Sequence, residues 1–327
     1  MGDVAMTVPV VRELNRQYPE VKITILTRAF FNPFFREFKN VTVYEADVKG
    51  KHKGIIGLYK LSKELKKLNI DTIADLHNVL RSNILKFFLS DIRVVQIDKG
   101  RKEKRALIKG RCFEQLKTTH ERYADVFRNL GFSLDLSQPK FPNKSGLNSK
   151  LSNLVGNTKK RIGIAPFAAF SGKAYPLKLM EEVIWELSKK HKILLFGGGK
   201  EEVARLNTIE NKYNNVLNLA GKLSLEEELD VISNLSVMIS MDSGNAHIAA
   251  MLGVEVVSLW GVTHPFAGFY PFNQKPSNAL LANREIFPQI PTSVYGNKYP
   301  EGYEKAIASI TPQQVIEKIN EVITKKG

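Results

Sequence analysis

The segment Asp242–His247 has the residue types of an anion-binding turn and reads Asp-Ser-Gly-Asn-Ala-His. An apolar run precedes it and a helical pattern follows it, so we expect Ser243 and Gly244 at the N-terminus of a helix. Backbone N–H groups and the helix dipole attract anions there, and Asp242 and His247 can reach a ligand held at that end. An ordinary helix cap formed by Asp242 or Ser243 explains the same residues, so both interpretations stay open.

Residues 166–173 form a second candidate loop, with the sequence Pro-Phe-Ala-Ala-Phe-Ser-Gly-Lys. This loop also lies between a strand-like run and a helical pattern. Lys173 at its end carries a compact positive charge that suits a diphosphate leaving group. A solvated loop lysine is the alternative.

Acidic residues follow glycines at two similar turns that lead into helical patterns. The glycines at 197–199 match neither the dinucleotide fingerprint nor the Walker lysine pattern, which favours a tight turn. Glu201 or Glu202, just after this turn, can accept hydrogen bonds from a ribose. In the first half, Gly2 and Asp3 hold the corresponding place. Asp3 is therefore a candidate general base, with a helix cap as the alternative.

Basic residues dominate the composition, with 48 Lys and Arg against 33 Asp and Glu and a net charge of +15. The densest run, at 99–105, includes Arg101, Lys102 and Arg105, and indicates a phosphate-binding patch for an anionic acceptor or a solvated surface. Arg81 follows another strand-like run, together with Asp75 and His77, and can contact the same acceptor. No aromatic residues interleave the basic run, which disfavours a nucleic-acid platform.

Several common features are absent from the sequence. No zinc-type Cys/His cluster and no Asp-x-Asp pair occurs, so we expect a mechanism without a metal or other cofactor. The single cysteine, Cys112, suits a reducing compartment or a small buried position. No apolar run approaches the roughly 18 residues of a membrane span and no signal peptide opens the chain, so a cytoplasmic location is expected.

Strand-like and helical patterns alternate along both halves of the 327 residues. This alternation predicts an α/β fold with two doubly wound, Rossmann-like domains, 1–150 and 151–327, that face a cleft. A stretch rich in Ser, Asn, Pro and Lys at 137–160 is the expected linker. The predicted elements are strands at 22–27, 41–46, 71–76, 92–97, 161–166, 192–197, 215–221, 237–241 and 254–261, and helices at 56–68, 79–89, 177–190, 201–213, 224–234, 243–252 and 312–325.

The beginning of the chain departs from this pattern, because an apolar helical pattern starts directly after Met1-Gly2-Asp3. A doubly wound domain normally enters such a helix from a buried central strand. We therefore expect the first strand of the N-terminal domain to be missing, through a start placed at an internal methionine. A domain that simply begins with a helix is the alternative.

In this order, the motifs resemble glycosyltransferase family 9, the ADP-heptose:lipopolysaccharide heptosyltransferases. The resemblance spans nearly the whole chain and rests on GDVAMTVPVVRELNRQYP, DTIADLHNVLRSNIL, KAYP, LLFGGGKEE, NLAGKLSLEEELDVI, MDSGNAHIAAMLGV and SLWGVTHP. It implies a GT-B fold, with an acceptor-binding N-terminal domain, a C-terminal domain for an ADP-sugar, and a last helix that packs back on the first domain.

The resemblance also implies roles for individual residues. Asp3 would deprotonate the acceptor hydroxyl in a single inverting displacement, and Lys173 would contact the diphosphate. The other implied donor-binding residues are Glu201 at the ribose, Leu223 at the adenine, and Asp242, Ser243, Gly244 and His247 at the pyrophosphate. Ala168-Ala169-Phe170 stands where the family often has hydroxyl residues, which leaves the donor nucleotide open.

Three other functions stay open at this point. A nucleotide-sugar epimerase of the same fold would need no acceptor, a basic nucleic-acid-binding protein would explain the charge, and an inactive relic would lack its first strand. For the transferase, the implied partners are a nucleotide-sugar donor, an anionic lipid-linked saccharide and no nucleic acid. The basic first half suggests peripheral contact with the inner face of the inner membrane.

Overall fold

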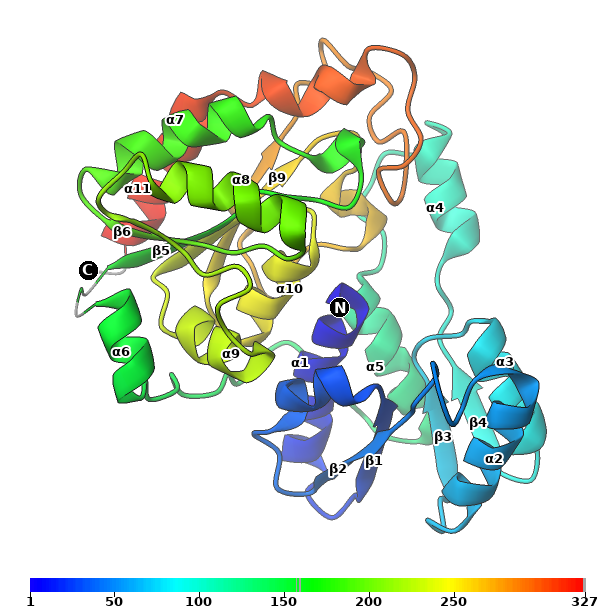
Figure 1. The fold of residues 1–327 in the computed structure, drawn as a ribbon. Coiled ribbons are helices and arrows are strands. Elements are labelled where there is room, and N and C mark those ends of the chain that lie inside the picture. The colour runs from blue at the N-terminus through cyan, green and yellow to red at the C-terminus, as the bar shows by residue number, and fades with distance from the viewer. Residues whose placement is uncertain (157, 159, 326–327) are drawn as a thin grey trace. The chain divides into compact units, whose positions relative to one another are not determined.

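The computed structural model describes residues 1–156, 158 and 160–325 and divides them into two compact units (Figure 1). The first unit contains Met1, residues 3–100 and residues 117–140, and the second contains Gly2, residues 101–116 and the chain from Phe141 onward. Residues 157 and 159 of the expected linker lie outside the described part, as do 326–327. Among the described residues, no helix is long and apolar enough to cross a membrane.

The first unit contains two parallel strand pairs, β1 with β2 and β3 with β4. Helices α2 and α3 pack together beside a core that includes Leu58, Leu61, Leu85 and Leu89. No strand joins the two pairs in the described part of the chain, so the first unit lacks the continuous sheet of a complete doubly wound domain. The unit's elements are α1 (Gly2–Gln17, of which Gly2 belongs to the second unit), β1 (Ile23–Thr27), β2 (Val41–Glu45), α2 (Gly54–Lys66), β3 (Thr72–Asp75), α3 (Leu80–Phe88), β4 (Arg93–Gln96) and α5 (Thr119–Leu130), with a 3-10 helix, η1 (Ala29–Phe35).

The second unit is built on one six-stranded parallel sheet in the order β10-β9-β8-β5-β6-β7. Its strands are β5 (Arg161–Ala165), β6 (Lys192–Leu195), β7 (Val216–Asn218), β8 (Val237–Met241), β9 (Glu255–Trp260) and β10 (Ala279–Leu281). All five residues of β8 are buried, because a central parallel strand is covered on both faces. The order reverses between β5 and β8, so the point at which doubly wound sheets bind ligands lies at the carboxyl ends of these two strands.

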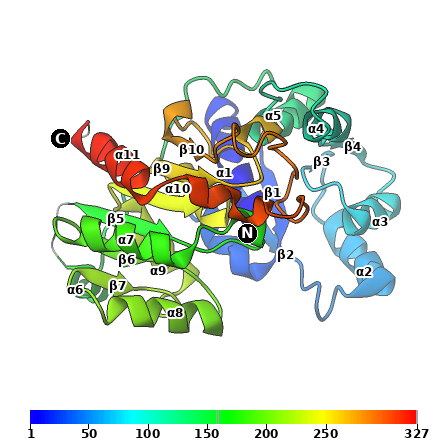
Figure 2. The same cartoon turned by 90° about the horizontal axis from the view of Figure 1, so that it is seen from above.

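Helices cover both faces of this sheet (Figure 2). Helices α7, α8 and α11 contribute to one apolar cluster and cover one face. Helices α9 and α10 contact each other, and the right-handed crossovers that lead to and from β8 place them on the opposite face. The helices are α6 (Ser149–Val155), α7 (Leu177–Ser188), α8 (Lys200–Glu210), α9 (Leu225–Ser233), α10 (Gly244–Met251) and α11 (Pro312–Thr324), with 3-10 helices η2 (Ser171–Lys173), η3 (Pro265–Ala267), η4 (Pro276–Asn278) and η5 (Tyr303–Ser309).

Helix α4 (Arg101–Ile108) is grouped with the second unit although it lies between β4 and α5 in the sequence. Buried Leu107 and Leu116 pack there with Ala267, and the Leu116 N–H donates to the carbonyl of Phe266 at 3.0 Å. The polypeptide therefore leaves the first unit after Gly100 and returns to it at Lys117.

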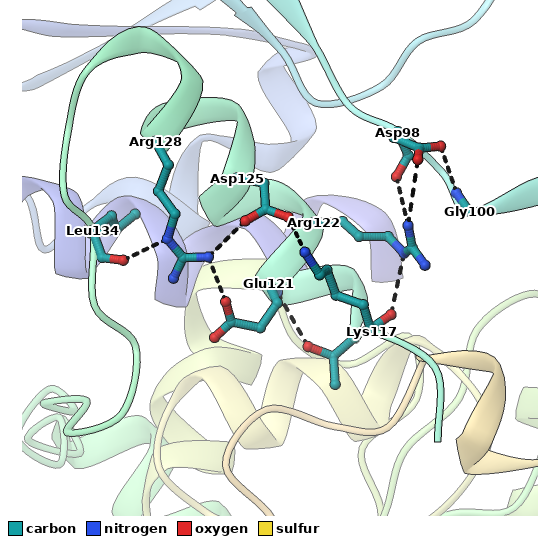
Figure 3. Close-up of polar contacts among 9 residues, drawn as sticks. Asp98, Gly100, Lys117, Glu121, Arg122, Asp125, Arg128 and Leu134 are labelled. Carbon is teal, nitrogen blue, oxygen red and sulfur yellow. Dashed lines mark hydrogen bonds and ion pairs between the residues drawn. The ribbon is translucent and has the colours of Figure 1, made fainter. Parts of the chain in front are cut away.

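Arg122 on α5 holds both ends of this excursion (Figure 3). Its guanidinium is buried and donates to the carbonyl of Lys117 at 3.2 Å and to the carbonyl of Asp98 at 3.4 Å. Gly100 has a φ of +61°, and a Cβ at this position would collide with the same guanidinium. One buried cation thus connects the point where the chain leaves the first unit with the point where it returns.

The expected linker at 137–160 contains a helix that its composition did not indicate. The Asn148 side chain caps α6 by accepting from the Leu151 N–H at 2.9 Å, and Leu151 and Val155 are buried. Helix α11 packs on α7, β8 and β9 of its own unit. The predicted return of this helix to the first domain stays a prediction.

Candidate active site

Four loops of the second unit follow the carboxyl ends of adjacent strands and carry the predicted donor-binding residues. Sheet order places the turn after β8 next to the loop after β5, followed by the turns after β6 and β7. These four positions hold Asp242–His247, Lys173, Glu201 and Leu223, respectively. Residues separated by up to 74 positions in the sequence therefore share one edge of the sheet, the edge at which parallel α/β sheets bind their ligands.

Lys173 and Asp242 form an ion pair across the switch point between β5 and β8. The Lys173 Nζ lies 3.4 Å from the Asp242 Oδ2, and the two side chains are only 14% and 9% exposed. A pair with so little exposure interacts more strongly than a surface pair, because little water screens it. The structure thus confines one positive and one negative charge at the edge where the sequence predicts an anionic ligand.

The loop that carries Lys173 is fixed by contacts with distant segments. The carbonyl of Gly172 accepts from the Val262 N–H at 3.0 Å, and the hydroxyls of Ser171 and Tyr299 are 2.5 Å apart. Gly296 lies against the Lys173 stem with a φ of +81°, and a Cβ there would overlap the Lys173 Cγ and come within 2.8 Å of its Cδ. Gly296 and Tyr299 could not be predicted from the sequence, because they lie in an irregular segment without strand or helix periodicity.

The turn after β8 leaves the first amides of α10 without a side-chain cap. Ser243 is the N-cap residue by position, but its side chain accepts no capping hydrogen bond. Its hydroxyl instead lies 3.0 Å from that of Ser240 on β8. The capping interpretation is therefore wrong for Ser243, and the amides at the start of α10 can interact with an anion. His247 lies one turn into the helix and is buried.

The two remaining donor candidates lie farther along the sheet. Glu201 in the first turn of α8 is 80% exposed, and one of its carboxylate oxygens lies 2.6 Å from Arg205. The neighbouring Glu202 accepts from the Gly198 N–H at 2.8 Å and so stabilises the glycine turn itself. Leu223 is partly exposed just before α9, where it can contact a flat apolar group.

The first unit carries Asp3 and Arg81 on exposed helix starts. Asp3 lies in the first turn of α1. The pKa of the Tyr123 hydroxyl is raised, mainly by the burial of Tyr123 and secondly by the negative charge of Asp3. Arg81 lies in the first turn of α3 and is exposed. Asp75 instead has a structural role, since its carboxylate accepts from the His77 and Asn78 amides at 3.0 and 2.8 Å.

Arg101, Lys102 and Arg105 are exposed on α4, while the face of α4 with Lys104 and Leu107 is buried. The Lys104 Nζ lies 4.0 Å from the centre of the Phe269 ring, a cation–π contact. Because α4 belongs to the second unit, the three basic candidates are held by the unit that also carries Lys173 and Asp242.

An aromatic cluster attaches the end of the 101–116 segment to the rest of the second unit. The Phe113 ring centre lies 5.0 Å from that of His264 and 3.6 Å from the Arg284 guanidinium carbon. The His264 Nδ1 accepts from the Phe266 N–H at 3.2 Å. Burial and, secondly, the Arg284 charge lower the pKa of His264 to about 4, so the imidazole is neutral at pH 7 and acts as an acceptor.

No cluster of three or more His, Cys, Asp or Glu side chains gathers as a metal site within the part of the chain that the structure describes. Cys112 is a free, partly buried thiol at the end of the α4 segment.

Known proteins resemble this chain in sequence over most of its length. The family model described as glycosyltransferase family 9 (heptosyltransferase) matches residues 58–290. Lipooligosaccharide heptosyltransferase 2 of Haemophilus influenzae is 26% identical, over 99% of this chain and 97% of its own length.

Two solved structures resemble the chain over nearly its whole length. The glycosyl transferase family 9 structure from Veillonella parvula has a TM-score of 0.76 at 18% identity and covers 99% of this chain and 94% of its own. The ADP-heptose lps heptosyltransferase II of E. coli has a TM-score of 0.71 at 20% identity and covers 99% of this chain and 96% of its own. These likenesses confirm the predicted GT-B fold.

Proposed function

The chain belongs to glycosyltransferase family 9, and from this premise we propose that it moves a heptose from ADP-heptose to a saccharide acceptor of the lipopolysaccharide core. The names of its relatives support the sugar, the nucleotide and the acceptor class. The observation that carries the proposal is the Lys173–Asp242 pair beside the uncapped start of α10.

In the proposed complex, the diphosphate of the donor binds between Lys173 and the first amides of α10. Both groups are positive and partly shielded from water, so they stabilise the charge that develops on the departing diphosphate. Asp242 orients the Lys173 ammonium before the donor binds, and then accepts hydrogen bonds from sugar hydroxyls. Leu223 lies beside the adenine and Glu201 at the ribose.

The proposed reaction is a single displacement with inversion at the anomeric carbon and without a metal. The acceptor oxygen forms its bond to the anomeric carbon while the bond from that carbon to the diphosphate oxygen breaks. The proton of the acceptor hydroxyl passes to the Asp3 carboxylate, and ADP leaves with the electron pair. Asp3 suits this role because its carboxylate is exposed at the start of α1.

For the acceptor, we propose contacts from Arg81 on α3 and from Arg101, Lys102 and Arg105 on α4. All four side chains are exposed and can neutralise phosphate groups of an anionic, lipid-linked saccharide. Such an acceptor would bring the enzyme to the cytoplasmic face of the inner membrane as a peripheral protein. Nucleic acid is not part of the proposal.

Nucleotide titration followed by thermal unfolding tests the donor assignment. We expect ADP to raise the melting temperature more than UDP, GDP or NAD, and the Lys173→Ala and Asp242→Ala variants to lose this stabilisation. Lys178→Ala, at an exposed lysine of α7, is the matched control and should keep it. A preference for UDP, or an ADP response unchanged in both site variants, would contradict the proposed donor site.

A transfer assay then tests the chemistry. With ADP-heptose and a lipopolysaccharide-core acceptor, Asp3→Asn should leave ADP binding unchanged and lower kcat by about a hundredfold or more, because the base is lost. Turnover of the sugar nucleotide without an acceptor would instead support an epimerase.

A further inference from the structure

Large apolar side chains are unusually exposed on helices α2 and α3 of the first unit. Ile56, Leu80 and Phe87 are 75%, 76% and 77% exposed, and Ile55 is 64% exposed. Among the described residues, five large apolar side chains are more than 60% exposed, and these four are on α2 and α3. Clustered exposure of this kind marks an interaction surface, whereas single exposed apolar residues are ordinary.

Ring contacts make the surface continuous across the two helices. The Tyr59 ring of α2 meets the Phe88 ring of α3 at 5.4 Å between centres, and Phe88 meets Phe87 at 5.7 Å. Ile55 and Ile56 lie one turn before Tyr59, on the same side of α2. Figures 1 and 2 both show α2 and α3 side by side at the margin of the first unit.

The charge on the same surface is positive. The two helices contain five basic residues and one acidic residue, Glu64. That acid is already paired, with its Oε1 at 2.7 Å from the Lys51 Nζ. Lys60 and Lys63 are exposed among the apolar residues, and the Lys63 Nζ lies 5.3 Å from the centre of the Tyr59 ring. Apolar groups and cations thus alternate on one side of α2.

The mixture of groups identifies the partner. Lysine is depleted from the cores of protein–protein interfaces, so a lysine-rich apolar surface fits a protein partner poorly. At an anionic bilayer, lysines pair with headgroups, aliphatic side chains enter the acyl boundary, and tyrosine favours the interface between the two. We propose that the α2–α3 surface, defined by Ile55, Ile56, Tyr59, Lys60, Lys63, Leu80 and Phe87, docks this protein on a bilayer of anionic phospholipids.

This inference rests on the membrane contact in the proposed function and assigns that contact to one surface. Arg81, a proposed acceptor contact, directly follows Leu80 on α3. Docking through α2–α3 would therefore hold that arginine at the level of the lipid headgroups, where a lipid-linked saccharide presents its phosphates. Lipid binding needs neither donor nor acceptor, so its failure and the failure of transfer are separate results.

Vesicle sedimentation of the 327-residue chain at low salt tests the surface. We expect binding to phosphatidylcholine vesicles that contain phosphatidylglycerol, and little binding to pure phosphatidylcholine. Ile56→Ser combined with Phe87→Ser, and Lys60→Glu combined with Lys63→Glu, should each lower the partition coefficient roughly tenfold or more. Because all four positions are exposed, unchanged melting temperatures and ADP responses should accompany these losses.

Matched controls separate the surface from nonspecific attraction by the net charge. Trp185→Ser with Ile286→Ser removes exposed apolar groups of the second unit, and Lys178→Glu with Lys190→Glu makes the same change in net charge. Both controls should stay within about twofold of the original protein. Absence of vesicle binding, or equal weakening by the charge control, would overturn the proposal. A third outcome would also overturn it: the protein does not bind vesicles but associates with itself, and the Ile56/Phe87 double variant abolishes that association. This result would identify a second copy of the chain as the partner.

Discussion

Gly296 shows how a residue without a side chain positions a charged one. Its Cα lies against the Lys173 stem at a φ of +81°, which an L side chain adopts only with strain. A methyl group here would displace the lysine from the position in which it meets Asp242. The geometry of the ion pair thus depends on a glycine more than a hundred residues away in the sequence.

We therefore expect Gly296→Ala to weaken ADP binding by about tenfold or more, as Lys173 moves away from the proposed position of the diphosphate. Gly302→Ala is a close control, because Gly302 has a φ of +84° and a Cβ at this position would meet only open space. Both variants should lose roughly 1–2 kcal/mol of stability through backbone strain, but only Gly296→Ala should change the ADP affinity. Calorimetric titration measures this difference, and equal affinities in the two variants would contradict it.

His264 predicts a dependence of stability on pH. Burial lowers its pKa to about 4 in the folded chain, from an ordinary value of 6.5. Below pH 6.5 His264 binds a proton in the unfolded chain but stays neutral in the folded chain until the pH nears 4. Its contribution to the free energy of unfolding is therefore complete above pH 6.5 and is lost as the pH falls toward 4. The loss reaches at most about 3 kcal/mol.

His264→Asn removes the titration and keeps an acceptor for the Phe266 amide, because asparagine caps helix starts well. Thermal unfolding at a series of pH values should therefore show a smaller acid-induced loss of melting temperature in this variant. Parallel curves for the two proteins would show that His264 does not titrate as its burial implies.

At the candidate site, the residues that follow apolar strands could be predicted from the sequence, because the strand pattern is local. Lys173 and Asp242 each follow a buried strand, and the reversal of strand order brings two such positions together. Tyr299 and Gly296 could not be predicted, because only the folded path of an irregular loop brings them to Lys173. The orientation of the Ser243 hydroxyl toward Ser240 likewise depends on the turn geometry and has no sequence signal.

Among the elements, apolar strands with helices between them were predicted within a few residues of their observed bounds. Helix α6 was missed because its Ser- and Asn-rich sequence is typical of linkers, although the Asn148 cap and two buried side chains stabilise it. Helix α4 was missed for a related reason. Its sequence, RKEKRALI, has too few apolar residues for a helical stripe, and contacts with the second unit stabilise it instead.

Helix α5 contains two arginines that allow a paired test of buried and exposed contacts (Figure 3). Arg122 is buried and bonded to carbonyls on both sides of the α4 excursion, whereas Arg128 is 33% exposed and pairs with Glu121 and Asp125. Arg122→Met should cost roughly 2–4 kcal/mol of unfolding free energy, because a buried guanidinium and its partly buried hydrogen bonds to two carbonyls are lost. Arg128→Met should cost about 1 kcal/mol or less. Urea denaturation measures both losses, and similar values would refute the role of Arg122 as the link between the two ends.

At the scale of the whole molecule, the chain from Asp3 onward passes between the two units three times, after Gly100, after Leu116 and after Lys140. A cut between residues 141 and 148 therefore leaves the 101–116 segment attached to the N-terminal fragment but packed in the second unit. We expect a protein cleaved there, at an inserted protease site, to elute as one species under native conditions. Phe113→Ser, which removes the ring between His264 and Arg284, should make the fragments separate more readily. Immediate separation of the unmodified fragments would contradict this packing.

The excursion also decides how halves of related enzymes can be exchanged. A single junction near residue 150 would combine one enzyme's six-stranded sheet with another enzyme's α4 segment. The residues at positions 107, 113 and 116 would then come from a different enzyme than the residues they pack against, at Phe266 and Ala267. Junctions at 100, 116 and 140 would transfer the sheet together with α4, which belongs to the same unit. The basic residues of α4, which we propose to contact the acceptor, would then be inherited with the proposed donor site. We therefore expect a chimera built in this way to take part of its acceptor preference from the parent that supplies its donor preference.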